Sequence, residues 1–210
     1  MVAGYAAISA GLIGIGLLIV HPLRNSGLVR WDTNVVRWLA AHRTASLTHL
    51  SAFWSKSADA PSIIAVGVVV SLVLAVRRRW DQIAWLGAIL AVELGTFLTI
   101  SYAVGRKRPT VAHLGSVPST GSFPSGHIAA TLVLYGFVTY LLWCNGASPL
   151  LRAIAGVWSM IAAASVGWAR MYRGMHHPLD VAAGAVMGLS LLAIFAWSRS
   201  ARIGPPSPPL

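Results

Sequence analysis

A polar start leads directly into an apolar run in FPSGHIAATLVLYGFVTYLL, residues 123–142. The run carries no charge after His127 and approaches the roughly 20 residues that a helix needs to cross a bilayer. Backbone N–H groups at a helix start are unpaired and sit at the positive end of the helix dipole, so they favour a bound anion. The stretch therefore predicts a membrane helix that begins in an anion site. The simpler alternative is a capped helix with an interfacial histidine.

The rest of the chain has the composition of a membrane protein. Hydrophobic residues make up 56% of the 210 residues and charged residues 10%, whereas soluble domains carry about 25% charged residues. We expect an all-α, integral-membrane bundle of six helices, with a short amphipathic helix lying at the interface over residues 32–42. Residues 1–203 form one domain in this interpretation, and the proline-rich residues 204–210 form a disordered tail. The expected spans cover about residues 3–20, 61–76, 83–104, 126–142, 151–168 and 179–197.

The net charge of +11 does not indicate a nucleic-acid partner. The basic residues lie at the ends of apolar runs, where they meet phospholipid headgroups and set orientation. The bilayer is therefore the expected partner. Arg77–Arg79, Arg152, Arg199 and Arg202 fall on one side, which the positive-inside rule makes cytoplasmic. We expect a bacterial plasma-membrane protein whose opposite, outward-facing side carries the anion site.

Two further clusters belong to that outward side. Gly105-Arg106-Lys107-Arg108-Pro109 follows the third span and is joined to Ser125 by a polar loop. Arg170, His176 and Asp180 surround the start of the sixth span, two crossings after Ser125. All three clusters should therefore share one membrane face. Guanidinium groups match phosphate oxygens, so the clusters predict a phosphate site; a surface run that binds headgroups is the alternative for the first.

The third cluster has the spacing of an activated nucleophile. Pro178 suits the first helical position and Asp180 the first turn. From there Asp180 should reach a ring nitrogen of His176 and free the other nitrogen to attack phosphorus. A purely dipolar role for Asp180 is the alternative. His127 is placed to protonate a leaving oxygen.

A metal ion is not expected in this site. The three clusters contain a single carboxylate among several cations, and these would repel a divalent ion. Glu93 lies in the middle of the third span, where an ionisable side chain is costly and often functional. A structural and a functional role both stay open for Glu93.

Together the clusters resemble the three-part signature of the type-2 phosphatidic acid phosphatase superfamily, which includes membrane lipid phosphate phosphatases and polyprenyl diphosphate phosphatases. The signature reads Lys-x6-Arg-Pro, Pro-Ser-Gly-His and Ser-Arg-x5-His-x3-Asp. The second part is intact here. Ala169 stands at the usual serine of the third part, and Ser101 stands at the usual lysine of the first.

The resemblance implies a phosphatase with no cofactor and no metal, acting on a lipid phosphate or diphosphate through a phosphohistidine. Polyprenyl diphosphate is the favoured substrate, with phosphatidic acid and phosphatidylglycerol phosphate as further candidates. A lipid phosphotransferase and an inactive lipid-binding homologue are the alternatives. The implied catalytic residues are His176, His127 and Asp180, and the implied phosphate-binding residues are Arg108, Arg170, Ser125 and Gly126. Arg106 and Lys107 are candidates to replace the missing lysine charge and to meet a second phosphate.

Overall fold

The computed structural model describes residues 2–200, where the regular secondary structure is entirely helical, with no strand. The predicted disordered tail, residues 204–210, lies outside the described part. Eight helices follow one another along the chain: α1 Val2–Val20, α2 Gly27–Ala41, α3 Ala45–Ser57, α4 Ala60–Val76, α5 Trp80–Val104, α6 Gly126–Cys144, α7 Pro149–Tyr172 and α8 Pro178–Ser200.

Six of these helices correspond to the six predicted spans. By length and composition α1, α5, α6, α7 and α8 can each cross a membrane alone. Helix α4 has 17 residues and passes the same test together with α3, from which it is bent by 53°. The all-helical membrane fold predicted from the sequence is confirmed.

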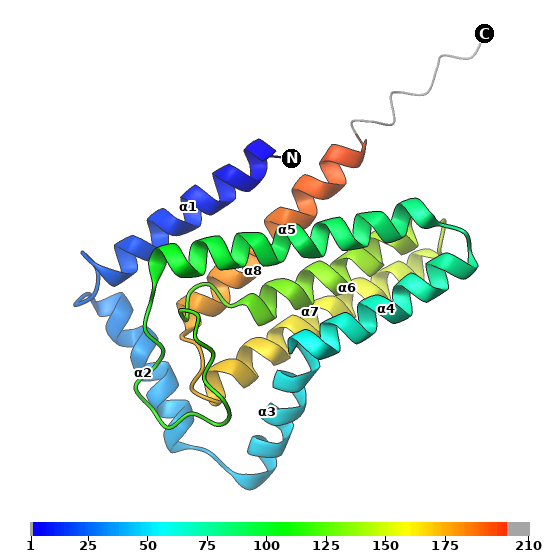
Figure 1. Cartoon of the computed structure of the whole chain (residues 1–210). Coiled ribbons are helices and arrows are strands. Elements are labelled where there is room, and N and C mark those ends of the chain that lie inside the picture. The colour runs from blue at the N-terminus through cyan, green and yellow to red at the C-terminus, as the bar shows by residue number, and fades with distance from the viewer. Residues whose placement is uncertain (1, 201–210) are drawn as a thin grey trace.

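The helices form an elongated bundle with one elaborated end (Figure 1). Helices α4 and α5 make a hairpin alongside α6, while α1 packs against α5 and α8. The α4–α5 and α6–α7 turns lie at one end of the bundle. Helices α2 and α3, the segment 105–125 and the α7–α8 turn gather at the other. The three polar clusters thus share one end.

Helix α6 forms the centre of the bundle and contacts α5, α7 and α8. Its contact with α8 is close because glycine faces the start of α6. A Cβ atom at Gly184 would lie 2.4 Å from the carbonyl oxygen of Ser125. The same junction contains a hydrogen bond of 2.9 Å from the Ser125 N–H to the Asp180 carbonyl. The second and third clusters are therefore fixed to each other by backbone.

The elaborated end contains one helix that the sequence did not predict. The amphipathic segment expected over residues 32–42 is part of α2, which begins earlier and buries Asp32 and Val36. Helix α3 is the addition. It starts at the N-cap Thr44, whose hydroxyl accepts a hydrogen bond from the N–H of Leu47, and it packs against α7.

Candidate active site

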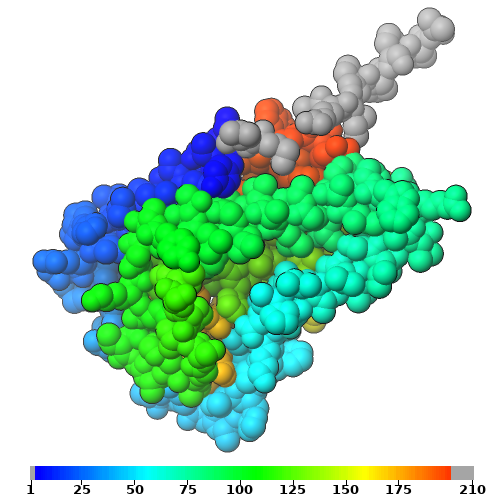
Figure 2. All heavy atoms as spheres, viewed as in Figure 1, coloured from blue at the N-terminus to red at the C-terminus, as the bar shows by residue number. Residues whose placement is uncertain are grey.

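A cavity of about 420 Å³ opens at this end of the bundle. The three clusters each contribute to its polar wall, through Arg108, Gly126, His127, Arg170 and His176. In the space-filling view a hollow lies between α3–α4 and the segment 105–125, with the α7–α8 turn visible inside it (Figure 2). The convergence expected from counting spans is therefore present.

The other wall of this cavity is apolar and comes from α4, α5 and α6. It includes Ile63, Ile64, Leu90, Leu94, Phe97 and Ala130. Ile64 and Leu94 are 63% and 53% exposed, so this wall continues to the outer surface of the bundle. Glu93 also lines this wall and is otherwise buried. The cavity thus joins a cationic region to a lipid-like one.

His176 is 2% exposed, and its ring is held by an unexpected partner. Nδ1 lies 2.7 Å from the carbonyl oxygen of Ser122. A carbonyl can only accept, so Nδ1 carries the proton and Nε2 keeps its lone pair. Asp180 Oδ2 is 3.9 Å from Nδ1, too far for the hydrogen bond we expected. The charge of Asp180 still lies beside the ring.

Burial lowers the pKa of His176 well below 6.5, and the nearby cations Arg170 and Arg108 and the imidazole of His127 lower it further. The imidazole is therefore neutral at pH 7, which leaves Nε2 available as a nucleophile.

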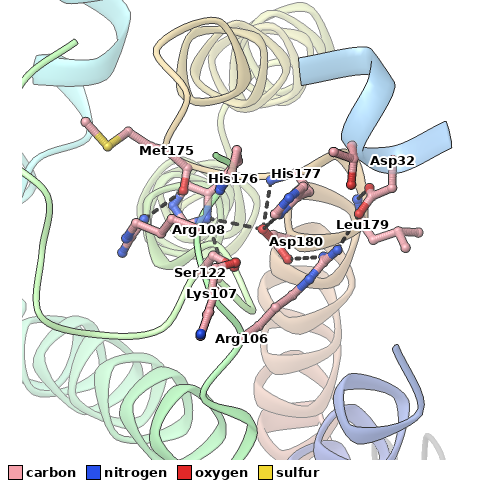
Figure 3. Close-up of polar contacts among 12 residues, drawn as sticks. Asp32, Arg106, Lys107, Arg108, Ser122, Met175, His176, His177, Leu179 and Asp180 are labelled. Atoms are coloured by element: carbon pink, nitrogen blue, oxygen red, sulfur yellow. Dashed lines mark hydrogen bonds and ion pairs between the residues drawn. The ribbon is translucent and has the colours of Figure 1, made fainter. Parts of the chain in front are cut away.

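Asp180 makes its hydrogen bonds elsewhere (Figure 3). Oδ2 accepts from the backbone N–H of His177 at 2.8 Å and lies 3.2 Å from His177 Nδ1. Oδ1 accepts from Arg106 Nη1 at 2.5 Å. Asp180 therefore fixes the turn that carries His176 rather than the His176 ring itself.

The structure corrects the role expected for Arg106. Its second nitrogen, Nη2, donates to Asp32 Oδ2 at 2.5 Å, and Asp32 Oδ1 accepts from the N–H of Leu179 at 2.8 Å. Burial alone would lower the pKa of Arg106, but Asp180 and Asp32 outweigh it and raise that pKa. Its charge is thus compensated by two buried carboxylates and does not face the cavity.

Arg108 and Arg170 are the two arginines that line the cavity. Arg108 donates to the carbonyl oxygens of Met175, Thr120 and Gly121, and burial lowers its pKa. Arg170 donates to Ser55 Oγ at 3.0 Å. The Nε atom of each arginine is buried and has no partner among the described residues. Each guanidinium is therefore anchored and still has a free donor.

The start of α6 is arranged partly as expected. Ser125 Oγ is buried and has no hydrogen-bond partner among the described residues, although Ser125 occupies the N-cap position. Its hydroxyl is thus unpaired, although Ser125 itself is not among the residues that line the cavity. The space at Gly126 has a second use, since a Cβ atom there would lie 3.0 Å from the ring of Phe97. The glycine therefore also permits the contact between α5 and α6.

His127 has a partner that sequence reasoning missed. Nε2 lies 2.8 Å from Asp59 Oδ1, and Asp59 comes from the bend between α3 and α4. His127 and Arg170 line both the main cavity and a neighbouring cavity of about 370 Å³. That second cavity adds the basic residues Lys56 and Arg173. Asp59, Lys56 and Arg173 belong to no recognisable motif in the sequence.

The first cluster differs most from expectation. Ser101 is fully buried, with Oγ 3.5 Å from the carbonyl oxygen of Gly121. Lys107 is exposed and lines a third cavity of about 390 Å³ together with Ser101, Arg106 and Arg108. It does not line the main cavity. The third cavity adjoins the main one through the shared residues Arg108, Pro118 and Thr120.

No cluster of three or more His, Cys, Asp or Glu side chains in residues 2–200 is placed to hold a metal ion. Asp180 is bound by Arg106 and His177, and Asp59 by His127, while Glu93 is a single carboxylate in the apolar wall of the cavity. The donor set around the cavity is instead suited to an anion.

Comparison with known proteins shows the family of the chain. A model of the PAP2 superfamily matches residues 82–203. The chain is 29% identical over 191 residues to an undecaprenyl-diphosphatase of Sulfolobus acidocaldarius, covering 87% of this chain and 85% of the relative. It is 29% identical over 163 residues to phosphatidylglycerophosphatase B of Bacillus subtilis, with coverages of 73% and 72%.

The fold is also similar to that of a solved structure. The transmembrane PAP2-type phosphatidylglycerolphosphate phosphatase from Bacillus subtilis superposes with a TM-score of 0.76 at 20% identity, over 92% of this chain and 96% of that one.

Proposed function

The chain belongs to the PAP2 superfamily, and from this premise we propose that it releases phosphate from a membrane lipid phosphate or diphosphate through a phosphohistidine. The observation that carries the proposal is the neutral, buried His176 in a cavity that also contains Arg108 and Arg170. A neutral imidazole is a nucleophile, and two anchored guanidinium groups neutralise the phosphoryl oxygens as charge develops.

The reaction has two steps. Nε2 of His176 forms a bond to phosphorus, the bond from phosphorus to the leaving oxygen breaks, and His127 gives that oxygen a proton. His127 then takes a proton from water, which attacks the phosphohistidine and releases phosphate and free His176. Arg108, Arg170, Ser125 and the first amides of α6 bind the phosphoryl oxygens. Asp180 acts through charge on the His176 ring and through the His177 turn.

The substrate we favour is a polyprenyl diphosphate. Undecaprenyl diphosphate is the substrate named for one relative, and the second cavity supports a substrate with two phosphates. Lys56 and Arg173 in that cavity adjoin His127 and Arg170, so they are placed to meet the leaving phosphate. Lys107 is the competing candidate for this role.

A chemical trap tests the phosphohistidine. Purified protein is mixed with labelled lipid diphosphate in detergent and chelator, quenched in alkali, and digested for peptide mapping. We expect alkali-stable, acid-labile label on the peptide that contains His176, with no label in His176→Ala. The matched control is His177→Ala, which should still be labelled. Label that survives in His176→Ala and disappears in His177→Ala would contradict the assignment, and dependence of turnover on added magnesium or zinc would contradict metal independence.

We place the site on the outer face of a bacterial plasma membrane, because Arg77–Arg79 and Arg152 lie at the opposite end. Single cysteines introduced into a Cys144→Ala background test this orientation with an impermeant reagent in intact cells. We expect labelling at the exposed Ser116→Cys and none at Arg78→Cys. The reverse pattern would place the site in the cytoplasm.

A further inference from the structure

Asp59 is the carboxylate bound to the proposed acid of the reaction. Its Oδ1 atom lies 2.8 Å from His127 Nε2, and it reaches that atom from the 53° bend between α3 and α4. The two residues are 68 positions apart. Their contact therefore depends on how α3 and α4 are placed against α6.

Helix capping does not account for this aspartate. Asp59 occupies the N-cap of α4, where an aspartate side chain commonly accepts a hydrogen bond from a helix N–H group. Here no side-chain capping bond is formed. The backbone carbonyl of Asp59 accepts from the N–H groups of Ser62 and Ile63, while the carboxylate is directed at His127. The side chain thus makes the contact with the histidine in place of the cap.

The cations around His127 explain why a carboxylate is needed at this contact. Arg170 and Arg108 line the same cavity as His127, and His176 lies in it as well. Two fixed cations oppose a third positive charge, so an imidazolium at His127 needs a compensating anion. Asp59 is the carboxylate that contacts His127; Asp180 is bound by Arg106 and His177, and Glu93 lines the apolar wall of the cavity.

We propose that Asp59 is a positioning residue that holds His127 as the proton donor of the phosphatase reaction. The inference rests on the function proposed above. Nε2–H of His127 donates to Asp59, and Nδ1, which has no partner among the described residues, carries the proton that moves to the leaving oxygen. The electron pair of the broken bond from phosphorus to that oxygen stays on the oxygen. The resulting neutral ring, still bound through Nε2–H, accepts a proton from water at Nδ1 in the second step.

A double-mutant cycle tests this role, because a residue that acts only through His127 has no effect once His127 is gone. The four proteins are the wild type, Asp59→Asn, His127→Ala and the double variant. The substrates are a long-chain alkyl phosphate, which needs a proton on its leaving oxygen, and p-nitrophenyl phosphate, which needs it far less. Asp59→Asn should lower kcat/KM about tenfold or more on the alkyl phosphate, within the range of general acid catalysis. The loss should be less than about threefold on p-nitrophenyl phosphate and less than about twofold in the His127→Ala background.

The pH profile provides a readout that a structural role would not change. Without the Asp59 charge, the protonated form of His127 is less stable, so the alkaline limb of kcat/KM should move to lower pH in Asp59→Asn. Asp59→Ser, which can restore a helix cap, should show the same shift and the same leaving-group dependence. Asp81→Asn is the charge-matched control at the exposed start of α5. It should leave the pH profile and the leaving-group dependence unchanged.

Equal losses on both substrates and in both backgrounds, with an unshifted pH profile, would overturn the role of Asp59 while leaving the phosphatase proposal intact. An unaffected Asp59→Asn would do the same. A wild-type protein that releases no phosphate from any lipid or from p-nitrophenyl phosphate would overturn both.

Discussion

Arg106 and Asp180 form a buried ion pair between residues 74 positions apart, and Asp32 completes it from α2. The pair connects the end of α5 to the first turn of α8, and Asp180 also accepts the N–H of His177 in the turn that carries His176. It therefore contributes to the shape of the catalytic end rather than to its free charge.

Removing Arg106 should destabilise the fold. Arg106→Ala leaves two buried carboxylates without their partner, a change that typically costs about 3–5 kcal/mol. We expect a clearly lower unfolding temperature in detergent, and losses of kcat/KM that are similar for monophosphate and diphosphate lipids. Lys107→Ala, one residue along and exposed, should leave the unfolding temperature nearly unchanged. If Arg106→Ala keeps the normal unfolding temperature and loses kcat/KM only for diphosphate lipids, Arg106 binds phosphate after all.

The second basic cavity should distinguish substrates by their number of phosphates. Lys56→Ala and Arg173→Ala should each lower kcat/KM for a lipid diphosphate by more than about threefold relative to the matching monophosphate, a difference of at least about 0.65 kcal/mol. Lys107→Ala should produce a smaller difference, because Lys107 lies outside both cavities that contain His127. A larger effect of Lys107→Ala than of Lys56→Ala and Arg173→Ala would indicate that the second phosphate binds in the third cavity instead.

The acid limb of the pH profile should report His176. The nucleophile works only when neutral, and its pKa lies well below 6.5 because of burial and the nearby cations Arg170 and Arg108. Activity should therefore persist as the pH falls through 6.5 and be lost only at lower pH. Measurement of kcat/KM with two substrates whose phosphates ionise differently separates the enzyme from the substrate. A limb at or above 6.5 that is common to both substrates would count against a neutral buried nucleophile.

The contact between α6 and α8 leaves no room for a side chain. With the backbone unchanged, Gly184→Ala would place a methyl group 2.4 Å from the Ser125 carbonyl oxygen. The two helices must therefore separate. Overpacking of this kind typically costs about 1–3 kcal/mol, and the shift should also lower kcat/KM because Ser125 and Asp180 meet there. Gly11→Ala is the matched control, since a Cβ at Gly11 has no neighbour within 4 Å. A stable, fully active Gly184→Ala would show that the junction tolerates movement.

The spans and the three clusters could be predicted because each is a local pattern. An apolar run indicates a span by its own length, and counting spans places the clusters on one side. The expected His176–Asp180 hydrogen bond is replaced by a longer contact of 3.9 Å for a physical reason. Spacing of four residues brings side chains together inside a helix, but His176 precedes Pro178 and lies outside α8. Asp180 therefore reaches the nearer His177.

The partners Asp32 and Asp59 could not be predicted in the same way. They lie 74 and 68 residues from the side chains that they bind, in segments with no recognisable motif. Such pairings depend on the packing of α2, α3 and α4 against the bundle, and a single sequence carries no direct signal of that packing. An isolated aspartate in a largely uncharged chain was the available clue.

The exposed Ile64 and Leu94 at the edge of the main cavity have a kinetic consequence. If the lipid chain stays among its neighbours while its headgroup meets His176, the rate follows the surface density of substrate rather than its amount per volume. Adding more vesicles of the same composition should then leave the turnover of each vesicle-bound enzyme unchanged. Diluting the substrate with inert phospholipid at constant total lipid should lower that turnover.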